Sequence, residues 1–151
     1  IEVNLHEDII NKVYDEQKKH AENKNIQLVL LDNLFDNMVV ADKNGIYQII
    51  NQLIDNAIKY SEEGVVETKL FLNDDSRKCI EITDTGIGID KDYIPYLFSA
   101  FSQEDNSYSR MFEGIGLGLA VVKAHCDLNN IAIEAISDKG KGTQFRLTFL
   151  Q

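Results

Sequence analysis

The chain has 151 residues, of which 44% are hydrophobic and 26% are charged, and its formal net charge is −10. These values are typical of a single globular domain with one core, so we expect one domain over residues 1–151 without an internal linker. The acidity argues against a nucleic-acid partner, and the lack of a long apolar run argues against direct membrane insertion. Cys79 and Cys126 have no motif spacing, which favours reduced thiols in a cytosolic compartment, with one disulfide as the alternative.

The N-terminal part of the chain predicts a strand, a helix and two further strands. They are expected over Ile1–Leu5, Asp8–Ala21, Ile26–Leu31 and Met38–Ala41. Asp42 is suited to cap a helix that runs from about Gly45 to Tyr60. In this helix the apolar side chains recur at helical spacing, which is the strongest periodic signal of the chain: Ile46, Ile49, Ile50, Leu53, Ile54 and Ala57.

The C-terminal part predicts two hairpins with helical segments between them. The expected elements are a hairpin of Val65–Leu72 with Lys78–Thr83, helices over Asp92–Phe98 and Leu117–Leu128, and a hairpin of Ile131–Ile136 with Thr143–Leu150. Ser102–Glu113 is polar and has no regular period. This inventory predicts an α+β fold, a two-layer sandwich in which about three helices pack on one side of a mixed, largely antiparallel sheet.

A polar stripe borders the apolar face of the helix over residues 45–60. It consists of Gln52, Asn56, Lys59 and Tyr60. Asn56 offers a neutral oxygen that suits Mg²⁺, and Lys59 offers a positive charge that suits phosphate. A solvated helix rim is the alternative, and the stripe alone does not decide between the two.

The first glycine-rich turn follows a predicted strand and reads Asp84-Thr85-Gly86-Ile87-Gly88. A carboxylate at a strand end can accept a hydrogen bond from an adenine amino group. Gly86 and Gly88 allow a positive φ and a close approach of the main chain. The alternative is a tight turn with an ordinary aspartate.

The second glycine-rich turn leads directly into a predicted helix, with glycine at positions 114, 116 and 118. Its free N–H groups and the positive end of the helix suit phosphate oxygens. A flexible hinge is the alternative. Arg110 could fold over a terminal phosphate and the Thr143 hydroxyl could reach the base, although each is also compatible with an ordinary surface or hairpin position. His6 is interpreted as a surface histidine rather than a phospho-acceptor.

Five blocks in this order resemble the catalytic and ATP-binding domain of sensor histidine kinases, in the superfamily shared with gyrase, the heat-shock 90 chaperones and the MutL proteins. They are Gln48–Tyr60 (N box), Asp84–Gly88 (first glycine box), Leu97–Phe101 (F box), Gly114–Ala120 (second glycine box) and Gly140–Phe145 (closing hairpin). The resemblance covers nearly the whole chain and implies a Bergerat-type ATP-binding fold.

The resemblance also implies a role for individual residues. Asn56 would bind Mg²⁺, and Asn56, Lys59 and Arg110 would act on the phosphates of ATP. Asp84 would recognise the adenine amino group, and Ser102–Glu113 would form a mobile lid. The remaining nucleotide contacts implied are Gln52, Tyr60, Gly86, Gly88, Phe98, Phe101, Gly114, Gly116, Gly118, Leu119 and Thr143.

The implied function is a protein-histidine kinase domain of two-component signal transduction. It would present the γ-phosphate of Mg·ATP to a histidine on the dimerisation domain of the same protein, with a response regulator downstream. That dimerisation domain is not part of the sequence, so we expect no autophosphorylation by this chain alone, and we expect it in the cytoplasm. The membrane anchorage of the parent protein is left open.

One position departs from the family pattern. Where the kinases usually carry asparagine and the gyrase-type ATPases carry glutamate, this chain has Gln52. An amide cannot act as a general base, which argues against a hydrolytic ATPase or a serine-directed kinase of the same superfamily. The other alternative is a degenerate ATP-binding module that docks partners without phosphoryl transfer.

Overall fold

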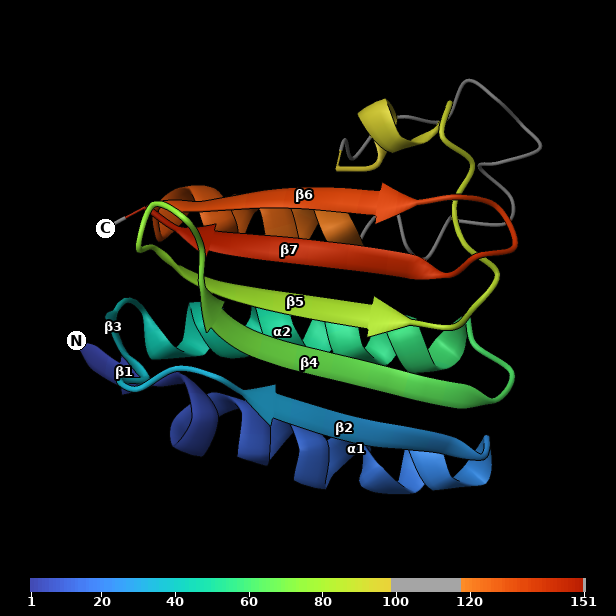
Figure 1. The fold of residues 1–151 in the computed structure, drawn as a ribbon, viewed down its shortest axis with the longest axis horizontal. Helices are drawn as coiled ribbons and strands as arrows, with labels where there is room; N and C mark the ends of the chain where they lie inside the picture. The colour runs from blue at the N-terminus through green and yellow to red at the C-terminus, as the bar shows by residue number, and fades with distance from the viewer. Residues whose placement is uncertain (99–117, 151) are drawn as a thin grey trace.

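The computed structural model describes residues 1–98 and 118–150. Its main sheet has five strands in the order β2-β4-β5-β7-β6 (Figure 1). The strands are β2 (Ile26–Asp32), β4 (Gly64–Leu72), β5 (Lys78–Asp84), β6 (Ile131–Ser137) and β7 (Thr143–Phe149). β2 pairs in parallel with β4, and the other neighbours are antiparallel. The predicted hairpins and the mixed, largely antiparallel sheet are therefore confirmed.

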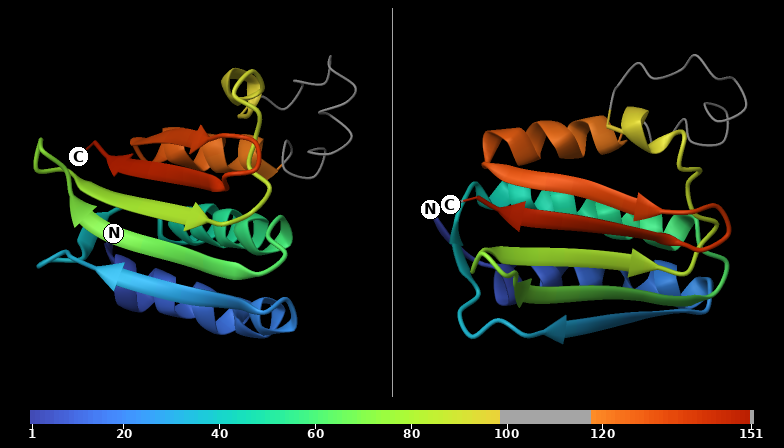
Figure 2. Two further views of the ribbon diagram at one scale, coloured as in Figure 1. Left: turned by 45° about the vertical axis from the view of Figure 1, so that its right-hand side comes forward. Right: turned by 45° about the horizontal axis from the view of Figure 1, so that its top comes forward.

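The helices cover one face of this sheet. α1 (Asn11–Asn23), α2 (Lys43–Lys59) and the helix over residues 118–128 lie on the same side, as Figure 2 shows. The short strands β1 (Glu2–Asn4) and β3 (Met38–Val40) form a separate antiparallel pair. The two-layer α+β sandwich predicted from the order of elements is confirmed.

α2 forms the centre of the core. Each of the six apolar residues that predicted its buried face is at most 4% exposed: Ile46, Ile49, Ile50, Leu53, Ile54 and Ala57. Asp42 caps the helix as expected, because its Oδ2 accepts a hydrogen bond from the N–H of Gly45 at 3.2 Å. At the other end, the Lys24 ammonium donates to the carbonyls of Ile58 at 2.9 Å and Lys59 at 2.8 Å. Both helix ends are thus satisfied by side chains, which holds α2 in place.

The first helical segment differs from the prediction. A π-helical turn over Leu5–Ile10 precedes α1, so the chain becomes helical before Asp8. Asn4 explains this start, since its Oδ1 accepts from the N–H of Glu7 at 2.8 Å while Asp8 accepts from the N–H of Asn4 at 2.9 Å. The helix expected over Asp92–Phe98 is also shorter, being a 3₁₀ turn over Ile94–Tyr96.

Two further expectations concern single side chains. Cys79 and Cys126 are both buried and free, so the disulfide alternative is wrong. Burial raises the pKa of Cys126 to about 12, which keeps it in the unreactive thiol form. His6 lies 2.7 Å from a carboxylate oxygen of Asp32 and joins the start of the chain to the end of β2. Among the described residues, no helix is long and apolar enough to cross a bilayer.

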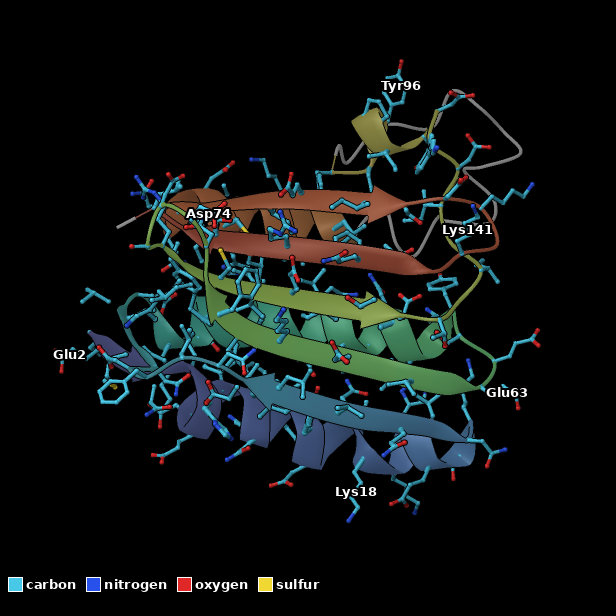
Figure 3. All side chains as sticks on the ribbon, in the orientation of Figure 1. Glu2, Lys18, Glu63, Asp74, Tyr96 and Lys141 are labelled. Carbon is cyan, nitrogen blue, oxygen red and sulfur yellow. The ribbon has the colours of Figure 1, made fainter. Side chains whose placement is uncertain are left out.

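Loops from distant parts of the chain meet at one end of the sheet. The side chains of Glu63, after α2, and Lys141, between β6 and β7, project at the end where β5 finishes (Figure 3). Glu2 and Asp74 mark the opposite end (Figure 3). The fold therefore brings the C-terminus of α2, the C-terminus of β5 and the β6–β7 turn together.

Candidate functional site

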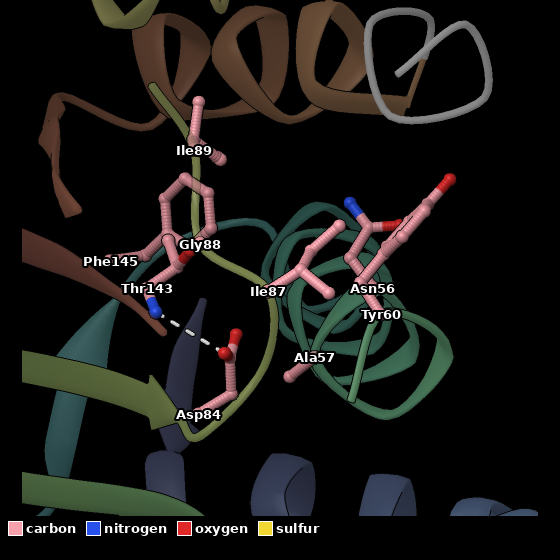
Figure 4. Close-up of a pocket in the computed structure, with 9 residues that line it drawn as sticks. All are labelled: Asn56, Ala57, Tyr60, Asp84, Ile87, Gly88, Ile89, Thr143 and Phe145. Atoms are coloured by element: carbon pink, nitrogen blue, oxygen red, sulfur yellow. Dashed lines mark hydrogen bonds between the residues drawn. The ribbon is translucent and has the colours of Figure 1, made fainter. Parts of the chain in front are cut away.

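A pocket lies where these three segments meet. Its lining residues are Asn56, Ala57, Tyr60, Asp84, Ile87, Gly88, Ile89, Thr143 and Phe145 (Figure 4). Five of the nine were predicted as site residues from the sequence, namely Asn56, Tyr60, Asp84, Gly88 and Thr143. The structure thus brings residues of the N box, the first glycine box and the closing hairpin together around one pocket.

Asp84 is the acidic group of this pocket. Its Oδ1 accepts hydrogen bonds from the N–H of Gly86 at 2.8 Å and from the N–H of Thr143 at 3.2 Å, the latter drawn in Figure 4. Burial raises the pKa of Asp84 above its ordinary value, while these two bonds to the carboxylate oppose the rise. Because both bonds end on Oδ1, the second oxygen is the one that can accept from a ligand.

The main chain of the first glycine box is held tightly on both sides. The N–H of Ile87 donates to the carbonyl of Tyr60 at 3.2 Å, and the carbonyl of Ile87 accepts from the N–H of Gly140 at 2.6 Å. A Cβ on Gly86 would lie 2.5 Å from the Tyr60 carbonyl oxygen, and one on Gly88 would lie 2.0 Å from that of Asp138. Of these two glycines, only Gly88 has a positive φ, at 75°. Gly86 is required by close packing against the protein's own main chain.

Ser137 joins the hairpin to the same turn. Its hydroxyl accepts from the N–H of Ile89 at 2.7 Å, donates to the carbonyl of Gly142 at 2.7 Å and lies 3.0 Å from the hydroxyl of Thr143. All three of these contacts are buried. Sequence reasoning missed Ser137, because a serine at a strand end carries no signal of such long-range contacts.

The polar stripe of α2 supplies a second group of site residues. Asn56 is only 7% exposed, and its Oδ1 accepts a hydrogen bond from Nε2 of Gln52 at 3.0 Å. Nδ2 of Asn56 is buried and has no hydrogen-bond partner among the described residues. Lys59 is exposed, with its ammonium 5.8 Å from the centre of the Tyr60 ring. The buried position of Asn56 does not fit a solvated rim, whereas the exposure of Lys59 is compatible with both interpretations.

Gly118 brings the second glycine box to this stripe. A Cβ on Gly118 would lie 2.6 Å from Nε2 and 2.7 Å from Cδ of Gln52. A residue with a side chain at position 118 would require the Gln52 amide to shift. The start of the helix over residues 118–128 thus lies directly beside the polar stripe of α2.

Two apolar residues predicted for the site do not line the pocket. Phe98 packs edge-on against the pocket residue Phe145, with ring centres 6.3 Å apart. Leu119 is fully buried in the core. The other predicted residues, Phe101, Arg110, Gly114 and Gly116, and the predicted lid over 102–113 lie outside the described residues.

The cavity between the lining residues is small. Its volume is about 20 Å³, which is room for roughly one water molecule, whereas ligand pockets typically measure ~300–1,000 Å³. Ile87 stands at its mouth with 41% of its surface exposed. The enclosed part of the pocket is therefore smaller than a typical ligand site.

The protein family described as "Histidine kinase-, DNA gyrase B-, and HSP90-like ATPase" matches residues 41–151. The chain belongs to this family. It is similar to the autoinducer 2 sensor kinase/phosphatase LuxQ of Vibrio parahaemolyticus, with 36% identity over 134 residues, and the match spans 85% of this chain but only 16% of that relative. The resemblance to the catalytic and ATP-binding domain of sensor histidine kinases is confirmed.

Solved structures agree with this assignment. The catalytic domain of the histidine kinase ThkA, in a nucleotide-free form, has a TM-score of 0.81 at 23% identity, and the match covers 99% of this chain and 93% of that one. Full-length ShkA in complex with AMPPNP has a TM-score of 0.78 at 26% identity, and the match covers 92% of this chain and 28% of that one. The first match shows the shared fold.

Proposed function

We propose that this histidine-kinase-type domain binds Mg·ATP and presents the γ-phosphate to a histidine on a separate domain of its parent protein. The observation that carries the proposal is Asp84, a half-buried carboxylate with one oxygen held by two main-chain N–H groups and the other available to a ligand. A carboxylate in this arrangement suits the amino group of adenine. Tyr60 and Thr143, which line the same pocket, would flank the base.

The phosphates would extend from the base along α2 toward Gly118. The helix over residues 118–128 begins beside Gln52 on the polar stripe of α2, and Lys59 on the same stripe is exposed and carries a positive charge that suits phosphate. Leu119 would contribute its N–H group, since its side chain belongs to the core. Gly114, Gly116 and Arg110 stay predicted phosphate contacts, and Phe101 a predicted anchor of the lid.

The donor set fits a magnesium ion that is held mainly by the nucleotide. Among the described residues, no cluster of three or more His, Cys, Asp or Glu side chains could hold a metal. Mg²⁺ commonly keeps several waters and takes one or two protein ligands together with substrate phosphates. Asn56 is that ligand in the proposal, and the ion would neutralise charge on the phosphates.

The contribution of the chain to phosphoryl transfer is positioning. The nitrogen of the acceptor histidine attacks the γ-phosphorus, the bond from phosphorus to the bridging oxygen breaks, and ADP leaves with that oxygen. Asp84 and the glycine boxes orient the nucleotide for this in-line attack. Gln52 cannot take a proton from water, so hydrolysis is not promoted. The acceptor domain and a response regulator are thus the proposed partners.

Gln52, which stands where the kinases usually carry asparagine, favours a second candidate, a degenerate module that docks partners without phosphoryl transfer. One experiment separates the two. The chain is mixed with the acceptor domain of its parent protein and with ATP labelled at the γ-phosphate. We expect labelled phosphohistidine on the acceptor domain, and none when the chain is omitted. Binding of AMP-PNP without any transfer would favour the degenerate module, and steady phosphate release by the chain alone would favour a hydrolytic ATPase.

A further inference from the structure

Gln52 and Asn56 form a hydrogen-bonded amide pair on one turn of α2. Gln52 donates through Nε2 to Oδ1 of Asn56 at 3.0 Å. This bond uses the oxygen that a cation would need. It also leaves the Nδ2 donor of Asn56 buried without a partner among the described residues, which is unfavourable for folding.

The amide of Gln52 can form this bond in either direction. It carries a donor and an acceptor at the same reach. If both amides turn over, Nδ2 of Asn56 donates to Oε1 of Gln52, and Oδ1 of Asn56 takes the place where its unpaired donor now lies. The pair then keeps one hydrogen bond and presents an oxygen instead of an N–H group.

Gly118 leaves room for this turnover. The amide of Gln52 packs so closely on Gly118 that a Cβ there would lie 2.6 Å from Nε2 and 2.7 Å from Cδ. The side chain can rotate its terminal amide in place, because nitrogen and oxygen are nearly equal in size.

We propose that Gln52 is a positioning residue that reverses its hydrogen bond to Asn56 when a divalent cation binds. In the cation-bound form Gln52 accepts from Asn56 and holds Oδ1 of Asn56 toward the metal. The inference rests on the proposed function, since the cation arrives with the nucleotide. It differs from direct ligation, because Gln52 acts through Asn56 and does not touch the ion.

The test follows the side-chain amide protons of both residues by NMR in the whole chain. The pair is observed before and after addition of Mg²⁺ with AMP-PNP. We expect protection from hydrogen exchange to move from the Gln52 amide to the Asn56 amide. In Gln52→Glu, which can only accept, the Asn56 amide should be protected from the outset. Gln48→Glu is the matched control, because Gln48 lies one turn earlier on the exposed side of α2, and it should behave like the unchanged chain.

Affinities give a second measurement that needs no catalysis. The ratio of AMP-PNP affinity with Mg²⁺ to that with EDTA is measured by calorimetry for Gln52→Met, which removes the hydrogen bond in both directions. We expect the ratio to stay within about twofold of the unchanged chain. A rise of about 2- to 10-fold, the effect of one hydrogen bond, would mean that Gln52 only competes with the cation. A similar fall would mean that Gln52 itself ligates it, and either result overturns the reversal.

Failure of the underlying function looks different. If the unchanged chain does not bind AMP-PNP at all, the proposed function and the inference both fall. If it binds Mg·AMP-PNP while the Gln52 amide stays protected and the Asn56 amide does not, only the reversal falls.

Discussion

Asp84→Asn tests the recognition of adenine without disturbing the fold. The amide oxygen of the variant would stay where Oδ1 now accepts from the N–H groups of Gly86 and Thr143. The amide nitrogen would replace the oxygen that is available to the ligand. A donor would then face the adenine amino group, which is also a donor, so neither group would be satisfied.

The expected loss follows from that one exchange of oxygen for nitrogen. A hydrogen bond to a charged group contributes ~1.5–3 kcal/mol, and leaving a buried donor unpaired costs ~1–3 kcal/mol. Allowing for partial overlap of the two effects, we expect AMP-PNP binding to weaken by about 2–4 kcal/mol, or roughly 30- to 1,000-fold. Guanine carries an oxygen at the position of the adenine amino group. The preference for AMP-PNP over GMP-PNP should therefore shrink or reverse.

Calorimetric titration of both analogues, with thermal unfolding as the check on folding, measures these effects. Burial raises the pKa of Asp84 in the folded state above its value in the unfolded state. The free energy of unfolding therefore falls as the pH rises from the unfolded-state pKa to the folded-state pKa, and above the folded-state pKa the full loss is present. Removing the charge should therefore leave the melting temperature at neutral pH unchanged or higher. An Asp84→Asn variant that melts normally and still binds AMP-PNP like the unchanged chain would refute the adenine role.

Three further predictions concern the same site and the helix beside it. Burial raises the pKa of Asp84, so on acidification Asp84 should become protonated, and adenosine affinity should fall, at a higher pH than for an exposed aspartate. Asp84→Asn should remove this pH dependence of the affinity. Binding titrations at several pH values measure both effects. Gly88→Ala should lower the melting temperature by at least ~4 °C, because φ is +75° and the new Cβ would lie 2.0 Å from a main-chain oxygen. Gly140→Ala is the matched control. Its φ is +83°, but no atom lies within 4 Å of the new Cβ, so the melting temperature should fall less. Lys24→Met should cost about 1 kcal/mol in urea unfolding, because the last carbonyls of α2 lose their cap; an unchanged unfolding midpoint would show that water replaces the ammonium.

The elements with strong local signals were predictable from the sequence. The apolar spacing along α2 and the Asp42 cap depend on residues within a few positions of each other. The π-helical turn over Leu5–Ile10 was not predictable, because the capping pair of Asn4 and Asp8 outweighs a strand signal that includes Leu5. The parallel pairing of β2 with β4 also lacks a local signal, since it joins strands that are separated by α2.

The site is harder to predict because its contacts span most of the chain. The N–H of Thr143 reaches Asp84 across 59 positions, and Ser137 reaches Ile89 across 48. Neither pair has a period or a spacing that sequence reasoning can use, so Asp84 could be assigned only through a resemblance of whole blocks. The resemblance did not predict that one oxygen of Asp84 accepts from two main-chain N–H groups while the other is available to a ligand. This arrangement depends on the closing hairpin being docked on the first glycine box, and a change that loosens this docking should therefore weaken adenine binding even when Asp84 itself is intact.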